Sequence, residues 1–259
     1  MPVLITGATG LVGRALAARL VTEGAQVRAF IRKDDPGLRS AGVHVAIGAA
    51  DNVERLEAAL TRVHTIVHLI GGYWPARGET YDLLNRDTTE AAVIAARAAD
   101  VQRFVFLSFP GADGGSTNAF LASKGRAERH ILDSGLEHAI FRCAPIWEGL
   151  PRLFERMRRG RVVTVPGTGS QQWNPVALDD VIGALIAADS RDEAVRGIWE
   201  LGGAEVLTLD EVVDRAMGPQ RKSHVGMLEA GPKPLTEVLA AGAVVDPGAA
   251  RAHFRLGAS

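Results

Sequence analysis

The sequence predicts an α/β fold with a doubly wound parallel sheet. Apolar, strand-like segments alternate with amphipathic helical segments over residues 2–145, a pattern typical of a parallel sheet with helices on both faces. The first apolar segment runs directly into glycines at positions 7, 10 and 13. The 259 residues suffice for one large domain, and a net charge of −1 gives no global field that favours nucleic acid.

The elements follow from apolar periodicity and from the glycines and prolines that interrupt it. The predicted strands are residues 3–5, 26–31, 42–48, 64–72, 103–109 and 137–142, and the predicted helices are 11–24, 52–63, 81–99 and 117–134. After Pro145 the alternation is less regular, with strands expected within 161–167 and 197–203 and helices from 178, over 208–217 and over 235–241. We therefore expect a nucleotide-binding core over residues 1–145 and a smaller mixed α/β lobe over 146–259, interleaved with the core on the substrate side.

The glycine-rich turn predicts a dinucleotide site. Gly7, Gly10 and Gly13 stand between a strand and a helix, and a second strand follows, as in a βαβ unit. Glycines let a pyrophosphate approach the backbone, and the free N–H groups of the helix N-terminus attract it. We expect the cofactor to contact a set of turn residues: Gly7, Thr9, Gly10, Leu11, Val12 and Gly13.

The end of the second strand bears on which dinucleotide binds. An acidic residue there favours NAD through the ribose hydroxyls, and an arginine accommodates the 2′-phosphate of NADP. Arg32 and Lys33 occupy this place, and a guanidinium makes charge-assisted contacts to phosphate. The sequence therefore favours NADP(H), and Asp34 keeps NAD(H) open as the alternative.

Several blocks in a fixed order carry a resemblance to a known superfamily. They are TGATGLVGR at 6–14, HLIGG at 68–72, RDTTEAAVIAARAADVQRFVFLS at 86–108, SKGRAERHILDSGLEHAIFRCAPIWEG at 123–149, NPVALDDVIGALIAA at 174–188 and ELGGAEVLTLDEVV at 200–213. The chain resembles the extended and atypical short-chain dehydrogenase/reductases, in particular the NmrA-like and complex I 39-kDa-subunit-like NAD(P)-binding proteins. The resemblance covers about residues 2–217 and implies a Rossmann fold.

The resemblance also implies further cofactor contacts. It places Asp51 near the adenine ring, although Asp51 and Asn52 are equally suited to cap the helix that follows. It places a second group against the adenosine half and a serine beside the nicotinamide: Leu69, Ile70 and Gly71, and Ser108.

The catalytic motif of the superfamily is only half present. Its standard form is Tyr-x-x-x-Lys on a helix, where the tyrosine exchanges the proton and the lysine lowers the phenol pKa and binds the nicotinamide ribose. Lys124 matches the lysine, but Phe120 stands at the tyrosine position and has no hydroxyl. The cofactor-binding half of the motif is therefore retained without the usual acid–base group.

Other residues are candidates for the missing proton chemistry. Lys124 itself is one, as in isoflavone-reductase-like relatives that use a lysine. Tyr73, in a loop expected to overhang the cofactor, is a second, with an apolar lid formed by Tyr73 and Trp74 as the alternative. Ser108 completes the expected catalytic set, and Ser123 is a weaker candidate.

Two functions fit these observations. The first is an NAD(P)H-dependent oxidoreductase that reduces a small carbonyl or quinone-type substrate without the usual tyrosine. The second is a non-catalytic NADP(H)-binding sensor or assembly protein, which the Phe120 substitution favours. A sugar-nucleotide epimerase or dehydratase is disfavoured, because those enzymes need the tyrosine.

The remaining features set expectations for location and partners. The single cysteine, Cys143, is compatible with a reducing cytoplasm, and the sequence shows neither a signal peptide nor an apolar run of membrane-spanning length. No metal-binding cluster is visible, since His64 and His68 on one strand stand about 13 Å apart. Related folds often dimerise through two long helices, here residues 81–99 and 117–134, so a homodimer is one expected state.

Overall fold

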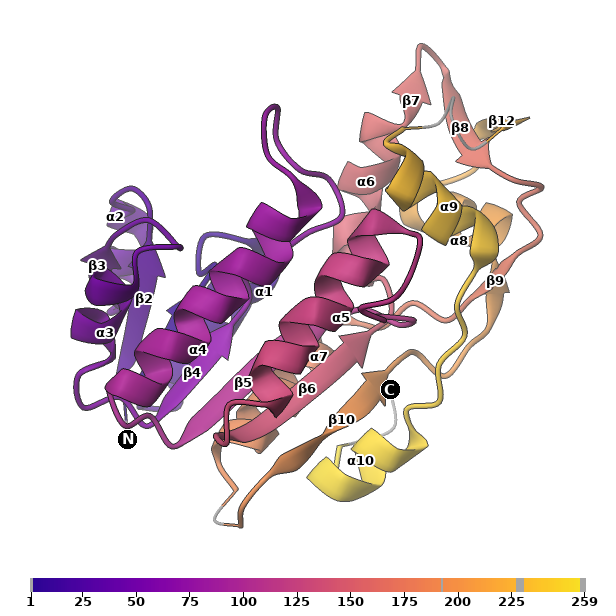
Figure 1. Cartoon of the computed structure of the whole chain (residues 1–259). Coiled ribbons are helices and arrows are strands. Elements are labelled where there is room, and N and C mark those ends of the chain that lie inside the picture. The colour runs from indigo at the N-terminus through magenta and orange to yellow at the C-terminus, as the bar shows by residue number, and fades with distance from the viewer. Residues whose placement is uncertain (1, 192, 227–230, 257–259) are drawn as a thin grey trace.

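The computed structural model describes residues 2–191, 193–226 and 231–256. Its centre is a seven-stranded parallel sheet in the order β10-β6-β5-β4-β1-β2-β3 (Figure 1). The strands are β1 Val3–Thr6, β2 Val27–Ile31, β3 His44–Ile47, β4 Thr65–His68, β5 Arg103–Ser108, β6 Glu137–Cys143 and β10 Arg196–Leu201. The order reverses between β1 and β4, which is where a doubly wound sheet opens a ligand crevice at its carboxyl edge. The predicted Rossmann fold is confirmed.

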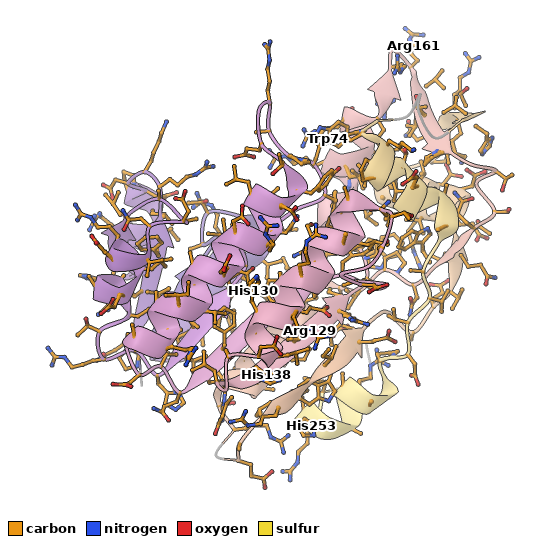
Figure 2. The ribbon with its side chains drawn as sticks, in the orientation of Figure 1. Trp74, Arg129, His130, His138, Arg161 and His253 are labelled. Carbon is orange, nitrogen blue, oxygen red and sulfur yellow. The ribbon has the colours of Figure 1, made fainter. Side chains whose placement is uncertain are left out.

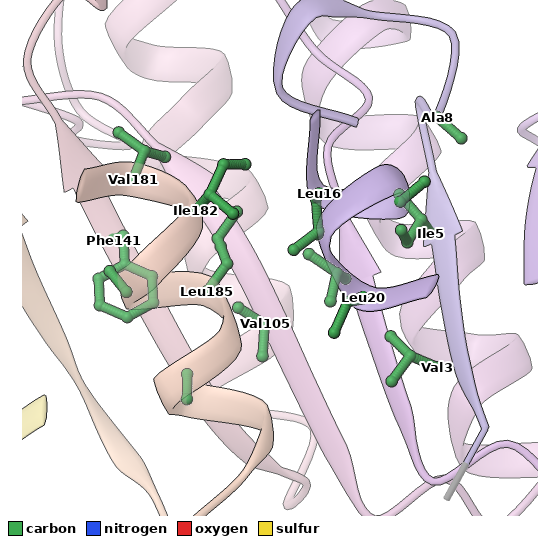
Figure 3. Close-up of a cluster of buried hydrophobic side chains, with 14 of the residues drawn as sticks. Val3, Ile5, Ala8, Leu16, Leu20, Val105, Phe141, Val181, Ile182 and Leu185 are labelled. Carbon is green, nitrogen blue, oxygen red and sulfur yellow. The ribbon is translucent and has the colours of Figure 1, made fainter. Parts of the chain in front are cut away.

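Helices cover both faces of the sheet. One face carries α3 Val53–Leu60, α4 Thr88–Ala98 and α5 Ala119–Leu132, and the other carries α1 Leu11–Thr22 and α7 Leu178–Asp189. Figure 3 shows the core beneath α1 and α7, where Leu16 and Leu20 of α1 and Leu185 of α7 pack against strand residues. Burying apolar side chains on both faces explains why the strands are nearly continuous apolar runs.

The second half of the chain contributes to two regions. β10 and α7 complete the main sheet and its helical layer, and α10 Gly248–Phe254 packs beside β10. The other elements form a separate apolar cluster above the carboxyl edge: η2 Trp147–Gly149, α6 Leu150–Arg156, β7 Arg158–Arg159, β8 Val162–Pro166, β9 Gln172–Trp173, β11 Leu207–Thr208, α8 Leu209–Met217, β12 Arg221–Val225 and α9 Lys233–Ala241. Among them, β12, β8 and β7 make a three-stranded sheet, and β11 pairs with β9.

Several elements differ from the sequence expectations. The strand expected over 64–72 ends at His68, and its last ladder bond to β1 runs from the Leu69 N–H to the Thr6 carbonyl at 3.2 Å. The helix expected over 81–99 begins as a π-helical segment, η1 Asp82–Asp87. Two short helices were not expected: α2 Pro36–Ser40, capped by Asp35, and α10. Within the described residues, no helix has the length and apolar character needed to cross a membrane.

Candidate functional site

The glycine turn is built by close backbone contacts at the end of β1. Gly7 has φ +71°, and a Cβ on it would lie 2.9 Å from the Leu69 carbonyl. A Cβ on Gly13 would lie 2.4 Å from the Gly7 carbonyl oxygen, so the first turn of α1 packs directly on the loop. Gly10 is less confined, because the nearest atom to its Cβ is 3.3 Å away. Gly7 and Gly13 therefore shape the turn, whereas Gly10 keeps its outer surface open.

The N-terminus of α1 suits a pyrophosphate. Gly10 is its N-cap residue and supplies no side-chain hydrogen bond, and no acidic residue stands in the first turn. Thr9, Gly10 and Leu11 are exposed there, Leu11 to 44%. Helix N-terminal N–H groups without a side-chain cap, under a backbone that glycines hold open, fit an anionic ligand. The local geometry therefore fits a dinucleotide.

After β2, the acidic side chains are held in ion pairs, whereas the basic side chains are exposed to solvent. Asp34 pairs with Arg39 at 2.8 Å, and Asp35 caps α2 and pairs with Arg14 at 2.5 Å. The Arg14 hydrogen bond is the main reason why the Asp35 pKa is lowered. The Arg32 side chain is 79% exposed, and its only ion pair among the described residues is a 3.9 Å contact with Glu79. Lys33 is also exposed.

At the end of β3, one residue caps the helix that follows. Asn52, not Asp51, caps α3, accepting from the Arg55 N–H at 2.9 Å. Asp51 lies one residue before the cap and is exposed. It is therefore free of the capping role that the sequence left open.

The β4 end is held by a residue that the sequence analysis missed, Asn85. Its side chain is fully buried, accepts from the Gly72 N–H at 3.0 Å and donates to the Gly72 carbonyl and to Ser123 Oγ. Gly71 has φ +147°, and a Cβ there would lie 2.8 Å from Asn85 Oδ1 and 2.9 Å from Lys124 Nζ. Asn85 stands in η1, and π-helical turns are frequent at functional sites. An asparagine inside an otherwise helical pattern was the available signal.

Lys124 is buried beside this loop. Its Nζ donates to the Leu107 carbonyl at 3.0 Å and stands 4.7 Å from the centre of the Phe106 ring. Burial lowers the Lys124 pKa to about 8, and the Glu128 carboxylate and the Cys143 thiol act in the opposite direction. The structure therefore brings Lys124 and Gly71 together, two of the residues expected to bind the cofactor.

A second buried base lies near Lys124. His68 Nδ1 is 2.9 Å from Thr6 Oγ1, and its Nε2 has no partner among the described residues. Burial, with a smaller contribution from the Lys124 charge, lowers the His68 pKa to about 3. The ring is therefore neutral, and it links the end of β1 to the end of β4.

Phe120 fills the usual tyrosine position within an aromatic cluster. Its side chain is 1% exposed, and its ring centre lies 5.2 Å from that of Phe109, 6.0 Å from that of Tyr81 and 6.1 Å from that of Tyr73. Burial raises the pKa of Tyr73, and the nearby Arg156 guanidinium opposes this. The neighbouring Trp74 stacks under Arg156 at 4.0 Å, beside α6 and α9 (Figure 2).

Ser108 forms a hydrogen bond with a carboxylate of α5. Its hydroxyl donates to Glu128 Oε1 at 2.6 Å, and Glu128 forms a buried ion pair with Arg142 at 2.7 Å. Glu128 lies one helical turn after Lys124, on the same face of α5. Sequence analysis missed Glu128 and Arg142, whose opposite charges on neighbouring apolar elements were the only signal.

Comparison with known proteins agrees with this geometry. The model of an NAD(P)H-binding family matches residues 7–173. The chain belongs to this family. Its described residues contain no group of three or more histidines, cysteines and carboxylates that would hold a metal ion.

Curated relatives confirm the expected superfamily. The chain is 27% identical over 245 residues to the 40 kDa subunit of mitochondrial NADH-ubiquinone oxidoreductase from Neurospora crassa, covering 91% of this chain and 65% of the relative. It is 29% identical over 208 residues to 2-alkyl-3-oxoalkanoate reductase from Stenotrophomonas maltophilia, covering 70% of this chain and 62% of the relative. The chain thus spans somewhat less than two thirds of the length of these relatives.

Solved structures confirm the fold. UDP-glucose 4-epimerase of Thermus thermophilus, in complex with NAD, superposes with a TM-score of 0.78 at 21% identity, over 98% of this chain and 93% of the epimerase. The chain is therefore an oxidoreductase-like NAD(P)H-binding protein with a Rossmann fold.

Proposed function

We propose that the protein is an NAD(P)H-dependent reductase of a small carbonyl or quinone-type substrate, and that Lys124 replaces the missing tyrosine as the proton donor. The observation that carries this proposal is the buried Lys124 ammonium, whose pKa of about 8 lies near neutral pH. General acids work best when their pKa is close to the working pH. Lys124 also lies beside Gly71, at the carboxyl edge where the sheet opens.

The protein residues divide the work as follows. The turn residues 7 and 9–13 hold the pyrophosphate, and Asp51, Leu69, Ile70 and Gly71 contact the adenosine half. When bound, the dinucleotide supplies a hydride. Lys124 donates a proton to the substrate oxygen and is reprotonated from solvent, so that a carbonyl and one hydride yield an alcohol.

Tyr73 and Ser108 have different roles in this proposal. The Tyr73 phenol carries no hydrogen bond among the described residues and stays protonated because burial raises its pKa. It is the second candidate donor, on the loop above Phe120. Ser108 acts by holding Glu128 one turn from Lys124, because its hydroxyl proton is committed to that carboxylate.

We infer that the preferred cofactor is NADP(H). The support is the difference between the acids and the bases after β2: Asp34 and Asp35 are paired, whereas Arg32 is exposed. Titration of the protein with NADPH and NADH tests this inference. Tighter binding of NADH would contradict it.

The test of the reductase is turnover by wild type and by Lys124→Gln. Oxidation of NADPH is followed by the absorbance of the reduced nicotinamide, with a panel of quinones, aldehydes and 3-oxoacids. Wild type should turn over at least one class, and Lys124→Gln should lose that turnover. Arg97→Gln, an exposed change on α4, is the matched control. Full activity of Lys124→Gln would exclude Lys124 as the donor.

A non-catalytic role is the second candidate, and the burial of Phe120 favours it. Phe120 at the tyrosine position is 1% exposed, and three aromatic rings pack against it, those of Tyr73, Tyr81 and Phe109. The relative from Neurospora crassa is named as a subunit of NADH-ubiquinone oxidoreductase. In the corresponding role, this protein would hold its dinucleotide as part of a larger assembly. Tight NADPH binding with no turnover across the panel would support this candidate and contradict the first.

Three further proposals concern organisation. Residues 1–145 act as the dinucleotide-binding core and 146–259 as the substrate-side lobe. The face of residues 81–99 and 117–134 mediates a homodimer, which its exposed Ile94 (49%) and Leu132 (37%) support. The single buried thiol of Cys143 suits a cytoplasmic location.

A further inference from the structure

A cleft of about 570 Å³ is lined by residues of β2, β3 and α3 and by residues that flank them. These three elements lie at one edge of the main sheet (Figure 1). Its lining is Pro2, Gln26, Arg28, His44, Ala46, Ile47, Arg55, Ala58, Ala59, Thr61 and Arg62. None of these residues belongs to the dinucleotide site described above. The lining contains three arginines and a histidine and no carboxylate.

The wall of the cleft is one stripe of α3 and the residues that follow it. Arg55, Ala58 and Ala59 lie at helical spacing on one side of α3. Arg62 follows the helix, two residues after its end at Leu60, and has φ +60°. The small alanines between the two arginines leave the space that the cleft occupies. The acidic residues of α3, Glu54 and Glu57, are absent from the lining.

The floor holds a second pair of basic groups. Arg28 of β2 and His44 of β3 are direct partners in the parallel register, and both line the cleft. Arg28 donates to the carbonyls of Ala59 and Thr61, so its guanidinium caps the end of α3.

That capping role does not explain the other basic groups. Arg55, Arg62 and His44 are exposed, and none of them forms an ion pair among the described residues. Many other arginines of the chain do pair with carboxylates, as Arg103 does with Glu137 and Arg142 with Glu128. The cleft therefore concentrates uncompensated positive charge in a protein whose net charge is −1.

We propose that this cleft binds a small phosphorylated metabolite. The phosphate groups contact Arg28, Arg55 and Arg62, whose guanidinium donors match phosphate oxygens. Pro2, Ala46 and the 47% exposed Ile47 offer an apolar surface for the rest of the ligand. The site is separate from the glycine turn, so it binds alongside the dinucleotide.

Calorimetry with sodium tripolyphosphate tests this site, on the full chain at low ionic strength and with NADPH saturating the glycine turn. Arg55→Gln/Arg62→Gln should weaken binding about tenfold or more, since two charge-assisted contacts are lost. Arg28 is left unchanged because it caps α3. Arg97→Gln on α4 is the matched control and should bind as wild type does. Hydrogen exchange should slow at α3 and β3 on binding.

The absence of tripolyphosphate binding to wild type would overturn the proposal, as would equal weakening by Arg97→Gln or protection confined to α1. Binding of polyglutamate without binding of tripolyphosphate would also overturn it, because the cleft would then recognise an acidic protein segment. Neither the calorimetry nor the hydrogen exchange depends on catalysis, so the result is independent of the proposed reductase activity.

Discussion

The rings of Tyr73 and Phe120 pack edge to face, with an interplanar angle of 90° and 6.1 Å between their centres. Phe120 stands one helical turn before Lys124, where the superfamily places its catalytic tyrosine. Tyr73 comes instead from the loop after β4 and packs on the ring that replaced that tyrosine. α5 therefore carries no phenol at this position, and the Tyr73 ring contacts the phenylalanine ring that stands there.

Removing the Tyr73 hydroxyl tests whether it takes part in the reaction. If the phenol assists Lys124, Tyr73→Phe should lower kcat about tenfold or more, with an unfolding free energy close to that of wild type. The reason is that the ring contact with Phe120 is kept and no described hydrogen bond is lost. Tyr81→Phe is the comparison, because it removes the 3.1 Å hydrogen bond to the Tyr73 carbonyl but keeps the Tyr73 phenol. An unchanged kcat in Tyr73→Phe would leave Lys124 as the sole donor.

The pH dependence of turnover should report on Lys124. A proton donor with a pKa of about 8 loses its proton as pH rises, so kcat should fall through that region. Glu128→Gln removes the strongest of the groups that raise the Lys124 pKa, so the midpoint of this fall should move to lower pH. The comparison of kcat profiles for the two proteins checks this. A Glu128→Gln protein with lower stability and an unshifted midpoint would assign the fall to another group.

The backbone of the site was predictable from sequence, and its side-chain network was not. Gly7 and Gly13 mark the turn because a Cβ at either position would press on neighbouring backbone, and the spacing of Phe120 and Lys124 marks one face of α5. By contrast, the hydrogen bonds by which Asn85 holds the loop after β4 depend on a π-helical turn that apolar periodicity does not reveal.

Tertiary pairing is the general reason for what was missed. Ser108 was expected beside the nicotinamide from its place at a strand end, but its partner is decided by Glu128 on α5. The strand expected to continue to residue 72 ends at His68, which lies opposite Thr6, the last residue of the neighbouring strand β1. Neither partner is adjacent in sequence, so neither contact leaves a local pattern.

The glycines of the turn should respond differently to alanine. Gly13→Ala would place a Cβ 2.4 Å from the Gly7 carbonyl oxygen, so α1 must move and the protein should lose several kcal/mol of stability. Gly10→Ala meets only a 3.3 Å contact, so it should fold and bind NADPH more weakly. Gly183→Ala, in α7 with open space around it, is the control and should be neutral or slightly stabilising. Thermal unfolding and NADPH titration check the series, and equal stability of the Gly10 and Gly13 variants would contradict it.

His68 should make the fold sensitive to acid. Its folded pKa is about 3 and its ordinary value is 6.5, so between these values the unfolded chain binds the proton and stability falls as pH is lowered. From pH 7 to pH 5 this linkage amounts to about 2 kcal/mol for one such group. His68→Leu lacks the linkage, so urea unfolding at the two pH values should show a smaller loss than in wild type. Parallel losses in the two proteins would show that folding does not lower the His68 pKa.

Glu79 should set the affinity for the 2′-phosphate. Its carboxylate stands 3.9 Å from the Arg32 guanidinium and competes with any phosphate for it. Glu79→Gln should therefore tighten NADPH binding several-fold, in keeping with the modest strength of exposed ion pairs, and leave NADH binding unchanged. Arg32→Gln should weaken NADPH binding and cancel the gain from Glu79→Gln when the two are combined. Asp34→Asn, which frees Arg39 instead, is the matched control, and fluorescence titration of each protein with both dinucleotides measures the effect. If Glu79→Gln changed NADPH and NADH binding alike, the loop and not the Arg32 contact would be responsible, and Arg32 would have no part in choosing the cofactor.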